Sequence, residues 1–501
     1  MTINLSKIAF VFMIMLSAVE ALGQNKLLDR SFWKSNPDLK TVKTLIKNGN
    51  SATDLNSNSF DAMSWALIEN APNNILEYLL EFEGNGVNKL THDGRSYIFW
   101  ATYGNNLEFM KTLIDRGAKT DIIDEHGYSL LNFCAATGNQ EQKIYDFIID
   151  HGSKPRNEVN RDGANALLLI IPFLKTTEFI DYFKKFGLSI HDKDKNGASS
   201  LMYAVKGQNF PMIQFLIDSG LDLNERDKEN QNAVHYAAKR QRGQTKNLEI
   251  FKYLKKAGLQ INEISESGET PLTIYAARNS KKDIIDFLVE NGNDPFHMPN
   301  EGRSAFISIS GKNTPIKLSS FNPNSESINF KTSKGETALH QAVKYGSLEN
   351  LNFLLDNGAN VHALNKDSKN LINYLFEGYR ESDHKSFIAK ANLLKKNGFN
   401  FSSILPDGNS LFHIAVDQNK ISLIDYLPGN ENHINHINND GITALHHAVM
   451  SSKDLSLIKA LIDKGADASI LTLFGETTME LAEENELLKP YANEFKIILA
   501  K

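Results

Sequence analysis

A short phrase recurs along this chain of 501 residues, and its recurrence limits the folds that are available. Residues 336–365 read ETALHQAVKYGSLENLNFLLDNGANVHALN, residues 441–469 read GITALHHAVMSSKDLSLIKALIDKGADAS, and residues 94–121 read GRSYIFWATYGNNLEFMKTLIDRGAKTD. Each copy opens in a short apolar run and closes in a Gly-Ala pair. A chain built from such copies grows by adding units to a stack, so its length does not indicate a set of separate globular domains.

One small residue precedes each phrase and keeps the copies in phase; we call it the rung residue. Several successive rungs are 33 residues apart, and the longer steps indicate short insertions rather than a loss of period. Glycine dominates the position, with serine or asparagine elsewhere, because a tight turn needs a backbone conformation that these residues tolerate. The rung residues are Ser59, Gly94, Gly127, Gly163, Gly197, Asn230, Gly268, Gly302, Gly335, Ser368, Gly408, Gly441 and Gly475.

Two residues after each rung, the sequence carries a side chain that can cap a helix. Its oxygen can accept a hydrogen bond from the exposed N–H groups of a first helical turn. The pattern therefore predicts a helix start at every rung. The predicted caps are Asp61, Ser96, Ser129, Asn165, Ser199, Asn232, Thr270, Ser304, Thr337, Asn370, Ser410, Thr443 and Thr477.

Apolar residues then recur at helical spacing in two groups, separated by a Tyr-Gly break. In the copy at 336–365 these groups are Leu339, Ala342 and Val343, then Leu351, Leu354 and Leu355. This spacing predicts two short antiparallel helices. Gly358 is typical of a residue that ends the second helix. The segment NVHALN after it is expected to form a hairpin-like finger that leads to the next rung.

These residues resemble the ankyrin-repeat family, whose D-x-x-G-x-T-P-L-H-x-A-A…L-L-x-x-G-A-D pattern they follow from about residue 26 to about residue 490. The resemblance implies an all-α solenoid of about 13 helix-turn-helix repeats joined by hairpin-like fingers. It also implies that the histidine of the T-P-L-H slot braces neighbouring loops. His235, His340, His413 and His446 occupy that slot here, whereas Phe99, Asn132, Met202 and Thr273 replace it in other repeats.

The repeats predict four segments. Residues 1–23 form a signal peptide, residues 24–301 an N-terminal block with its cap, and residues 335–501 a C-terminal block with its cap. Residues 302–334 lie between the blocks and form a degenerate repeat, because KNTPIKLSSFNPNSESINF is a poor second helix. We expect this degenerate repeat to be a flexible joint.

The first two dozen residues differ from the rest of the chain. MTINLSK is followed by the almost wholly apolar run IAFVFMIMLSAVEAL, and Ala21 and Gly23 occupy the small positions of a cleavage site. This pattern is typical of a secretory signal peptide cut before Gln24. The alternative, an uncleaved anchor, is disfavoured because the apolar run is shorter than the ~20 residues that span a bilayer, and it contains Glu20. We therefore expect a periplasmic or secreted protein.

The composition excludes several function classes. The chain has 54 basic and 60 acidic residues, so a nucleic acid is not the expected partner. Its one cysteine, Cys134, cannot form a disulfide within the chain, and it occupies a slot that alanine fills elsewhere. We interpret this cysteine as core filler.

Metal-binding and catalytic patterns are incomplete. DKDKNG (192–197) matches the first half of a calcium loop, but the position that needs a bidentate glutamate is Tyr203. His433 and His436 lie together, yet they lack the spacing of a zinc site. We expect no metal, no cofactor and no catalytic residues.

Aromatic residues recur one position before the alanine pair, which has two interpretations. They could stack on a ligand, or they could fill the core between repeats, and their place on the buried stripe favours the core. These residues are Trp65, Trp100, Phe133, Tyr203, Tyr236 and Tyr374.

An all-repeat chain supplies surface rather than an active site. We expect a non-enzymatic scaffold that binds another protein through a concave surface of fingers and first helices, and a monomer without a membrane span after cleavage. The alternatives are a self-associating structural subunit or stalk, and an enzyme whose site is built on the repeats.

In the resembled family, contacts come from the finger tips, the residue after the rung and the pair after the alanines. Among the positions that match, the tyrosines are the strongest candidates, because exposed aromatic residues are frequent among binding hot spots. The candidate partner-binding residues are His92, Asp93, Arg95, Tyr103, Glu125, His126, Tyr128, Lys195, Asn196, Lys206, Lys228, Glu229, Lys239, Arg240, Lys344 and Tyr345.

Overall fold

The computed structural model describes residues 25–241, 245–401, 404–405, 407–427 and 433–499. The predicted signal peptide, residues 1–23, lies outside this range. Contacts divide the chain into two compact units, one of Met1–Ala237 with Gln241–Lys246 and the other of Ala238–Arg240 with Asn247–Lys501. The regular structure of the described residues is helical, apart from one isolated bridge between Lys193 and Ser199. This confirms the all-α fold.

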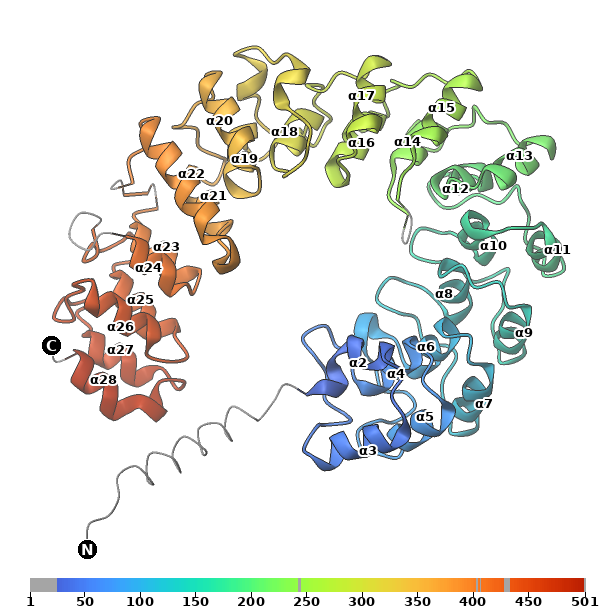
Figure 1. The fold of residues 1–501 in the computed structure, drawn as a ribbon, viewed down its shortest axis with the longest axis horizontal. Coiled ribbons are helices and arrows are strands. Elements are labelled where there is room, and N and C mark those ends of the chain that lie inside the picture. Colours follow the sequence, from blue (N-terminus) through green and yellow to red (C-terminus); the bar gives the residue numbers. More distant parts are fainter. Residues whose placement is uncertain (1–24, 242–244, 402–403, 406, 428–432, 500–501) are drawn as a thin grey trace, which may run out of the picture. The chain divides into compact units, whose positions relative to one another are not determined.

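In the first unit the helices form two rows, and each repeat adds one helix to each row (Figure 1). The first helices of its repeats are α2 (Arg30–Lys34), α4 (Ala62–Ile68), α6 (Tyr97–Tyr103), α8 (Leu130–Ala136), α10 (Ala166–Ile170), α12 (Ser200–Lys206) and α14 (Ala233–Ala238). The second helices are α3 (Leu39–Lys47), α5 (Asn73–Leu80), α7 (Leu107–Asp115), α9 (Gln142–Asp150), α11 (Glu178–Lys184) and α13 (Phe210–Asp218). The 3₁₀ turns are η1 (Lys26–Leu28), η2 (His92–Gly94) and η3 (Ile171–Phe173).

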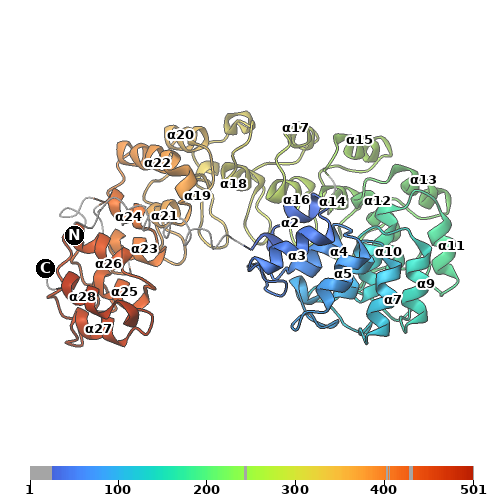
Figure 2. The ribbon, with the colours of Figure 1, turned by 60° about the horizontal axis from the view of Figure 1, so that its bottom comes forward.

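The second unit repeats the arrangement, and Figure 2 shows α20 and α22 above α19 and α21. Its first helices are α16 (Pro271–Arg278), α18 (Ala305–Ser310), α19 (Ala338–Lys344), α21 (Leu371–Glu377), α23 (Leu411–Asp417), α25 (Ala444–Ser451) and α27 (Thr478–Glu484). Its second helices are α15 (Leu248–Lys256), α17 (Lys282–Glu290), α20 (Leu348–Asp356), α22 (His384–Lys396), α24 (Ile421–Tyr426), α26 (Ser456–Asp463) and α28 (Ala492–Leu499). The 3₁₀ turns are η4 (Leu318–Phe321), η5 (Ser327–Asn329), η6 (Glu381–Asp383) and η7 (Lys489–Tyr491).

The predicted rungs and caps are confirmed. Every rung residue has a positive φ, including Ser59 (60°) and Ser368 (59°), where the side chain tolerates a conformation that glycine adopts more readily. Each predicted cap is the residue immediately before a helix, from Asp61 before α4 to Thr477 before α27. The local sequence therefore determines where each first helix begins.

The fingers are tight turns that join successive repeats. The residue three before the rung donates its backbone N–H to the carbonyl of the residue after the rung, as from Asp194 to Ala198 (3.1 Å) and from Asn365 to Lys369 (3.0 Å). In several repeats a finger also donates to its predecessor, as from Lys366 to the carbonyl of Lys334 (2.9 Å). Residues in the same register of these linked fingers therefore lie side by side.

Two histidines of the T-P-L-H slot, His413 and His446, brace the stack as expected. The backbone N–H of Ser410 donates to His413 Nδ1 (3.2 Å), and His413 Nε2 lies 3.1 Å from the carbonyl of Ile442 in the next finger. His446 Nε2 likewise lies 3.0 Å from the carbonyl of Ile470. These rings link a helix start to the following finger.

The degenerate repeat at 302–334 lies inside the second unit. Its first helix, α18, is regular, but η4 and η5 replace the second helix, as the poor helical pattern predicted. The 3₁₀ turn η4 packs against both α18 and α20, and it buries Leu318 and Phe321. Whether this repeat acts as a joint remains a prediction.

Candidate functional site

The predicted partner-binding residues fall into two groups. Those up to Glu229 belong to the first unit, and Lys239, Arg240, Lys344 and Tyr345 belong to the second. The finger-tip residues that the structure exposes are Glu125, His126, Lys195, Asn196, Lys228 and Glu229. His92 and Asp93 are half-buried: His92 Nδ1 lies 2.8 Å from the carbonyl of Asn58, and its ring stacks on Phe60.

The assignment of Arg95 to the binding surface is wrong. Arg95 is 3% exposed, and its guanidinium lies 2.7 Å from the buried carboxylate of Asp124 and 2.9 Å from that of Asp93. It also lies over the rings of Trp100 and Phe133. Because Asp124 comes from the following finger, Arg95 joins two repeats and does not face a partner.

Four further candidates are only partly accessible to a partner. Tyr128 and Lys239 are half-buried, as is Lys206, whose pKa is lowered by burial against the opposing charges of Asp162 and Asp194. Lys344 is also half-buried and lies 2.6 Å from Glu377. Burial alone would lower the pKa of Lys344, but its bond to Glu377 raises it above the usual value.

Tyr103 and Tyr345 are the exposed aromatic candidates. Tyr103 is 40% exposed at the end of α6, and Tyr345 is 53% exposed at the end of α19. Tyr103 is the last residue of α6 and Tyr345 directly follows α19, so both lie at the position that the resemblance assigned to contacts. Both tyrosines therefore remain candidate binding residues.

The aromatic row has a structural role. In four repeats the ring bonds a residue nine positions earlier, at the base of its own finger: Trp100 Nε1 to Thr91 (2.7 Å), Tyr203 to Asp194 (3.0 Å), Tyr236 to Asp227 (2.9 Å) and Asn365 to Tyr374 (2.9 Å). Trp100, Phe133, Tyr236 and Tyr374 are buried, and Trp65 and Tyr203 are half-buried. This confirms the interpretation as core that also fastens the fingers.

The incomplete metal patterns are likewise accounted for. Asp194 of DKDKNG accepts the backbone N–H groups of Asn196 and Ala198 and the hydroxyl of Tyr203, so it closes a turn. His433 and His436 lie with ring centroids 5.8 Å apart. Within the described ranges, no group of three metal-ligating side chains gathers around one point.

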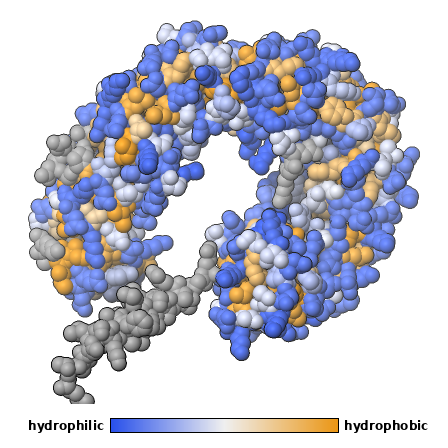
Figure 3. Space-filling view, in the orientation of Figure 1, coloured by the Kyte–Doolittle hydropathy of each residue, from blue (hydrophilic) through white to orange (hydrophobic). Residues whose placement is uncertain are grey.

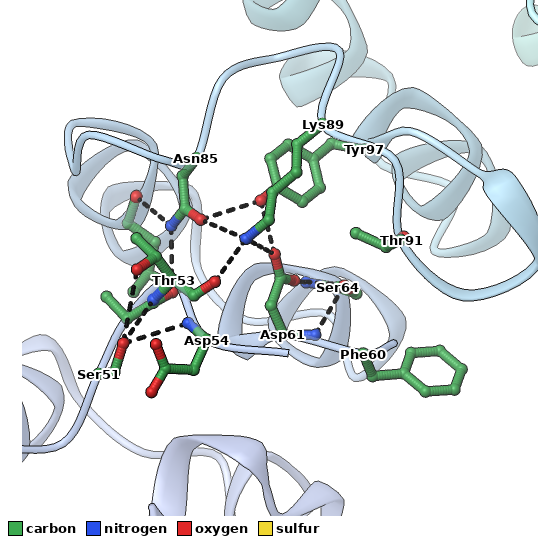
Figure 4. A network of polar contacts seen from close by, with 12 residues as sticks. Ser51, Thr53, Asp54, Phe60, Asp61, Ser64, Asn85, Lys89, Thr91 and Tyr97 are labelled. Atoms are coloured by element: carbon green, nitrogen blue, oxygen red, sulfur yellow. Dashed lines mark hydrogen bonds and ion pairs between the residues drawn. The ribbon is translucent and has the colours of Figure 1, made fainter. Parts of the chain in front are cut away.

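Figure 4 shows a buried polar network that joins two repeats of the first unit. The carboxylate of Asp61 caps Ser64 at the start of α4, accepts the hydroxyl of Tyr97 (2.7 Å) and pairs with Lys89 (2.8 Å). Asn85 accepts bonds from Lys89 (3.1 Å) and Tyr97 (3.1 Å). Burial, followed by the charge of Asp61, raises the pKa of Tyr97 far above its usual value. Mutual bonds occupy these groups, which therefore stabilise the stack.

Cys134 is buried, as its alanine slot predicted. Burial raises the pKa of its thiol to about 12, so the reactive thiolate is scarce at neutral pH. The described part of the chain also contains no helix long and apolar enough to cross a membrane.

A row of exposed aliphatic side chains was not predicted. It lies four residues before the rung, and each member is between 40% and 59% exposed. A fixed offset from the rung would have revealed it in the sequence. We call it the finger stripe: Leu55, Leu90, Ile123 and Val159 in the first unit, and Ile264, Leu364, Ile437 and Leu471 in the second. On the face that Figure 3 draws, hydrophobic residues form patches separated by hydrophilic ones.

A cavity of about 500 Å³ lies in the second unit, beside α19, α21 and α22. A longer turn between the two helices of one repeat, Gly378–Asp383, forms part of its wall, whereas the preceding repeat has only Tyr345–Ser347 there. The candidates Lys344 and Tyr345 line it together with Arg380 and Lys390. The sequence showed the insertion as a 40-residue step between Ser368 and Gly408, but it did not show that the insertion forms a cavity.

Paired helices, left-handed rungs and linked fingers define a helical repeat protein that presents surface. The chain belongs to the ankyrin-repeat family: the family model for ankyrin repeats (3 copies) matches residues 33–124, 63–158, 167–264, 201–298, 246–367 and 363–472. Ankyrin repeats are interaction modules, and the family supports a role in binding protein.

Similar proteins come from distant organisms. An ankyrin repeat protein of Borreliella burgdorferi is 36% identical over 104 residues, which is 21% of this chain and 24% of that protein. The human transient receptor potential cation channel subfamily A member 1 is 23% identical over 439 residues, 85% of this chain and 38% of the channel. An ankyrin repeat protein of Acanthamoeba polyphaga mimivirus is 24% identical over 372 residues, 68% and 42% of the two chains. The matches thus cover between 24% and 42% of these relatives.

Proposed function

We propose that this chain is an exported, non-enzymatic scaffold that binds another protein along its fingers and the ends of its first helices. The observation that carries the proposal is the repeated exposure of side chains at one register of successive fingers. Leu90 and Ile123 belong to fingers that are joined by a bond from Glu125 to the carbonyl of Asp93 (2.9 Å), so the two aliphatic side chains belong to one surface. Tyr103 is exposed at the end of the first helix between these fingers.

Aliphatic residues flanked by charged tips suit a protein surface. Apolar anchors supply most of the binding energy, while the surrounding polar rim excludes water and selects the partner. The buried polar groups around Asp61 are occupied by internal bonds and support this role rather than catalysis.

The experiment is capture of the partner with the mature chain by proximity labelling, followed by affinity measurements on variants. Replacing Leu90 and Ile123 with serine, or Tyr103 and Tyr128 with alanine, should weaken binding at least about tenfold. The control is Ile421→Ser, which changes an exposed aliphatic side chain at the start of the second helix α24, outside the finger stripe, and should leave the affinity unchanged. Unchanged affinity in both variants, with unchanged melting temperatures, would place the partner elsewhere.

Export is tested separately. If the chain is exported, protein from its native host should begin near Gln24, because the small residues before it match a cleavage site. N-terminal sequencing of the host protein reads this directly. An intact segment 1–23 in a soluble cytoplasmic fraction would overturn the export part of the proposal.

A second candidate function is self-association, favoured by the last finger. Leu473 and Phe474 at its tip are 75% and 81% exposed, and Leu471 of the finger stripe lies in the same turn. Other finger tips carry polar or charged pairs, such as Lys366 and Asp367. Light scattering decides this function: a concentration-dependent dimer that Leu473→Ser with Phe474→Ser abolishes supports it, and a monomer at all concentrations excludes it.

A further inference from the structure

The cavity of about 500 Å³ in the second unit has walls of two kinds. One wall is apolar or aromatic and includes Leu375, Tyr379 and Phe387, with Tyr379 and Phe387 at 5.0 Å between ring centroids. The other wall is basic. Cavities of this size accommodate small organic ligands, with apolar walls for contact and a few polar groups that fix orientation.

The positive charge of the cavity is concentrated in three side chains, Lys344, Arg380 and Lys390. Asp383 is the one carboxylate in the lining. The whole chain has a net charge of −6, so a basic cavity is a local departure from the average. Glu377, which is not part of the lining, forms an ion pair with Lys344 and balances its charge. The remaining charged side chains of the lining are the cations Arg380 and Lys390 and the carboxylate Asp383.

The two remaining cations, Lys390 and Arg380, differ in burial. Lys390 is 6% exposed, and its Nζ donates to the carbonyls of Ala342 (3.2 Å) and Val343 (3.0 Å) at the end of α19. An ammonium group has three donors, so two carbonyls leave one N–H for a further acceptor. Arg380 is exposed, and among the described residues its guanidinium has no hydrogen-bond or ion-pair partner.

We infer that this cavity binds an organic carboxylate with an apolar body. The carboxylate would lie between Arg380 and the free donor of Lys390, and the apolar part would contact Tyr379 and Phe387. Guanidinium and carboxylate groups match in geometry and form charge-assisted bonds, which are stronger than neutral ones. This inference does not depend on the proposed protein-binding role.

Such a carboxylate has two sources, a free organic acid or the C-terminus of a peptide. The probes are therefore 4-phenylbutyrate and the peptide acetyl-Ala-Ala-Phe, each compared with its uncharged amide. Calorimetry on the full mature chain should show one site with a Kd on the order of 1 mM for at least one acid. Binding of the small acid alone identifies a free acid, and binding of the peptide identifies a chain terminus. Both results support the inference.

Three variants test the assigned residues. Arg380→Gln should weaken binding of the acid about tenfold, and Asp383→Asn should strengthen it because a repelling carboxylate is lost. Lys366→Gln, which removes an exposed cation from a finger tip of the same unit, should change the Kd less than about twofold. Lys390→Met is informative only where its melting temperature matches that of the parent, because Lys390 also caps α19.

Any of three results would overturn the inference. One is equal binding of the acids and their amides, which would show that charge plays no part. Another is the absence of heat from either acid up to about 10 mM. An effect of Lys366→Gln as large as that of Arg380→Gln would also do so, because it would reduce the binding to general charge attraction.

Discussion

At the scale of single residues, several buried polar side chains in this protein hold repeats together. Arg95 illustrates why the sequence misassigned one of them. Its slot after the rung points to solvent in the family pattern, but its guanidinium is neutralised by Asp124, which lies 29 residues further on. That pairing depends on the spacing of two fingers in space. A position in the repeat therefore predicts the backbone, but it does not predict which charges meet.

The first prediction concerns the network of Figure 4. Tyr97→Phe removes the hydroxyl that Asp61 and Asn85 accept, and it leaves a buried carboxylate with one donor fewer. We expect the free energy of unfolding of the first unit to fall by ~1–3 kcal/mol. Thermal melts measure it, with Tyr103→Phe at an exposed site as the matched control. Equal melting temperatures of the two variants would contradict the importance of the network.

The second prediction is a loss of stability in mild acid. Burial lowers the pKa of His340 and of His413 to about 4, below the value of about 6.5 expected for the unfolded chain. At pH values between these two pKa values, the unfolded chain binds more protons than the folded chain does. The free energy of unfolding therefore falls as the pH decreases through this range. We expect each ring to contribute a loss on the order of 1–2 kcal/mol by pH 5.

Melting temperatures of the second unit at pH 7 and pH 5 check this prediction. The control variant is His340→Asn with His413→Asn, which is expected to be less stable at pH 7 but to depend less on pH. A parent chain that melts at the same temperature at both pH values would refute the assignment of these rings as buried and neutral.

At the scale of elements, the sequence predicts what is local. Every helix start after a rung was predicted because both the turn and the cap are satisfied within a few residues. Thr443 is an example: its side chain accepts from the backbone N–H of His446 (3.2 Å), a bond within one helical turn. Short-range bonds of this kind leave a pattern in one segment, which is why the fold could be predicted.

Contacts between elements could not be predicted in the same way. Side chains from one repeat cap the first helix of the preceding repeat, as Asn350 does at Ser310 (3.3 Å) and Lys390 does at Ala342 (3.2 Å). Lys312 does the same at Asn279 (2.8 Å), and burial lowers its pKa to about 8. Asparagine and lysine are common surface residues, so only the stack reveals that these side chains are caps. The wall of the cavity could not be predicted for the same reason.

The third prediction concerns the degenerate repeat. Limited proteolysis of the folded protein should cut first between residues 311 and 334, because no second α-helix protects that segment. The structure narrows the expected position to Asn322–Glu326, which is largely exposed between the buried side chains of Phe321 and Ile328. Mass spectrometry of early fragments identifies the cut. First cuts at the chain ends alone would mean that the 3₁₀ turns protect the repeat as well as a helix does.

At the scale of the whole molecule, stability is distributed along each stack. A repeat buries its apolar stripe only against its neighbours, so the free energy of one repeat depends on the next. The sequence predicted a division at 302–334, whereas the compact units divide near residues 238–247. Both places depart from the regular repeat. The sequence could show that both segments are irregular. It could not show which of the two segments is crossed by fewer contacts and therefore divides the chain.

The last prediction follows from this distribution. Leu354 and Leu355 on α20 are 0% and 9% exposed, and replacing both with alanine should cost ~2–5 kcal/mol for each side chain. Because α20 packs against α19, α22 and η4, the loss should reach the adjacent repeats and not remain in one helix. Hydrogen exchange followed by mass spectrometry should then show faster exchange from α18 to α22. Leu348→Ala is the matched control, since this leucine of the same helix is 44% exposed and should leave exchange unchanged. Faster exchange confined to α20 would show that each repeat is stable on its own. That result would contradict the coupling of stability between neighbouring repeats.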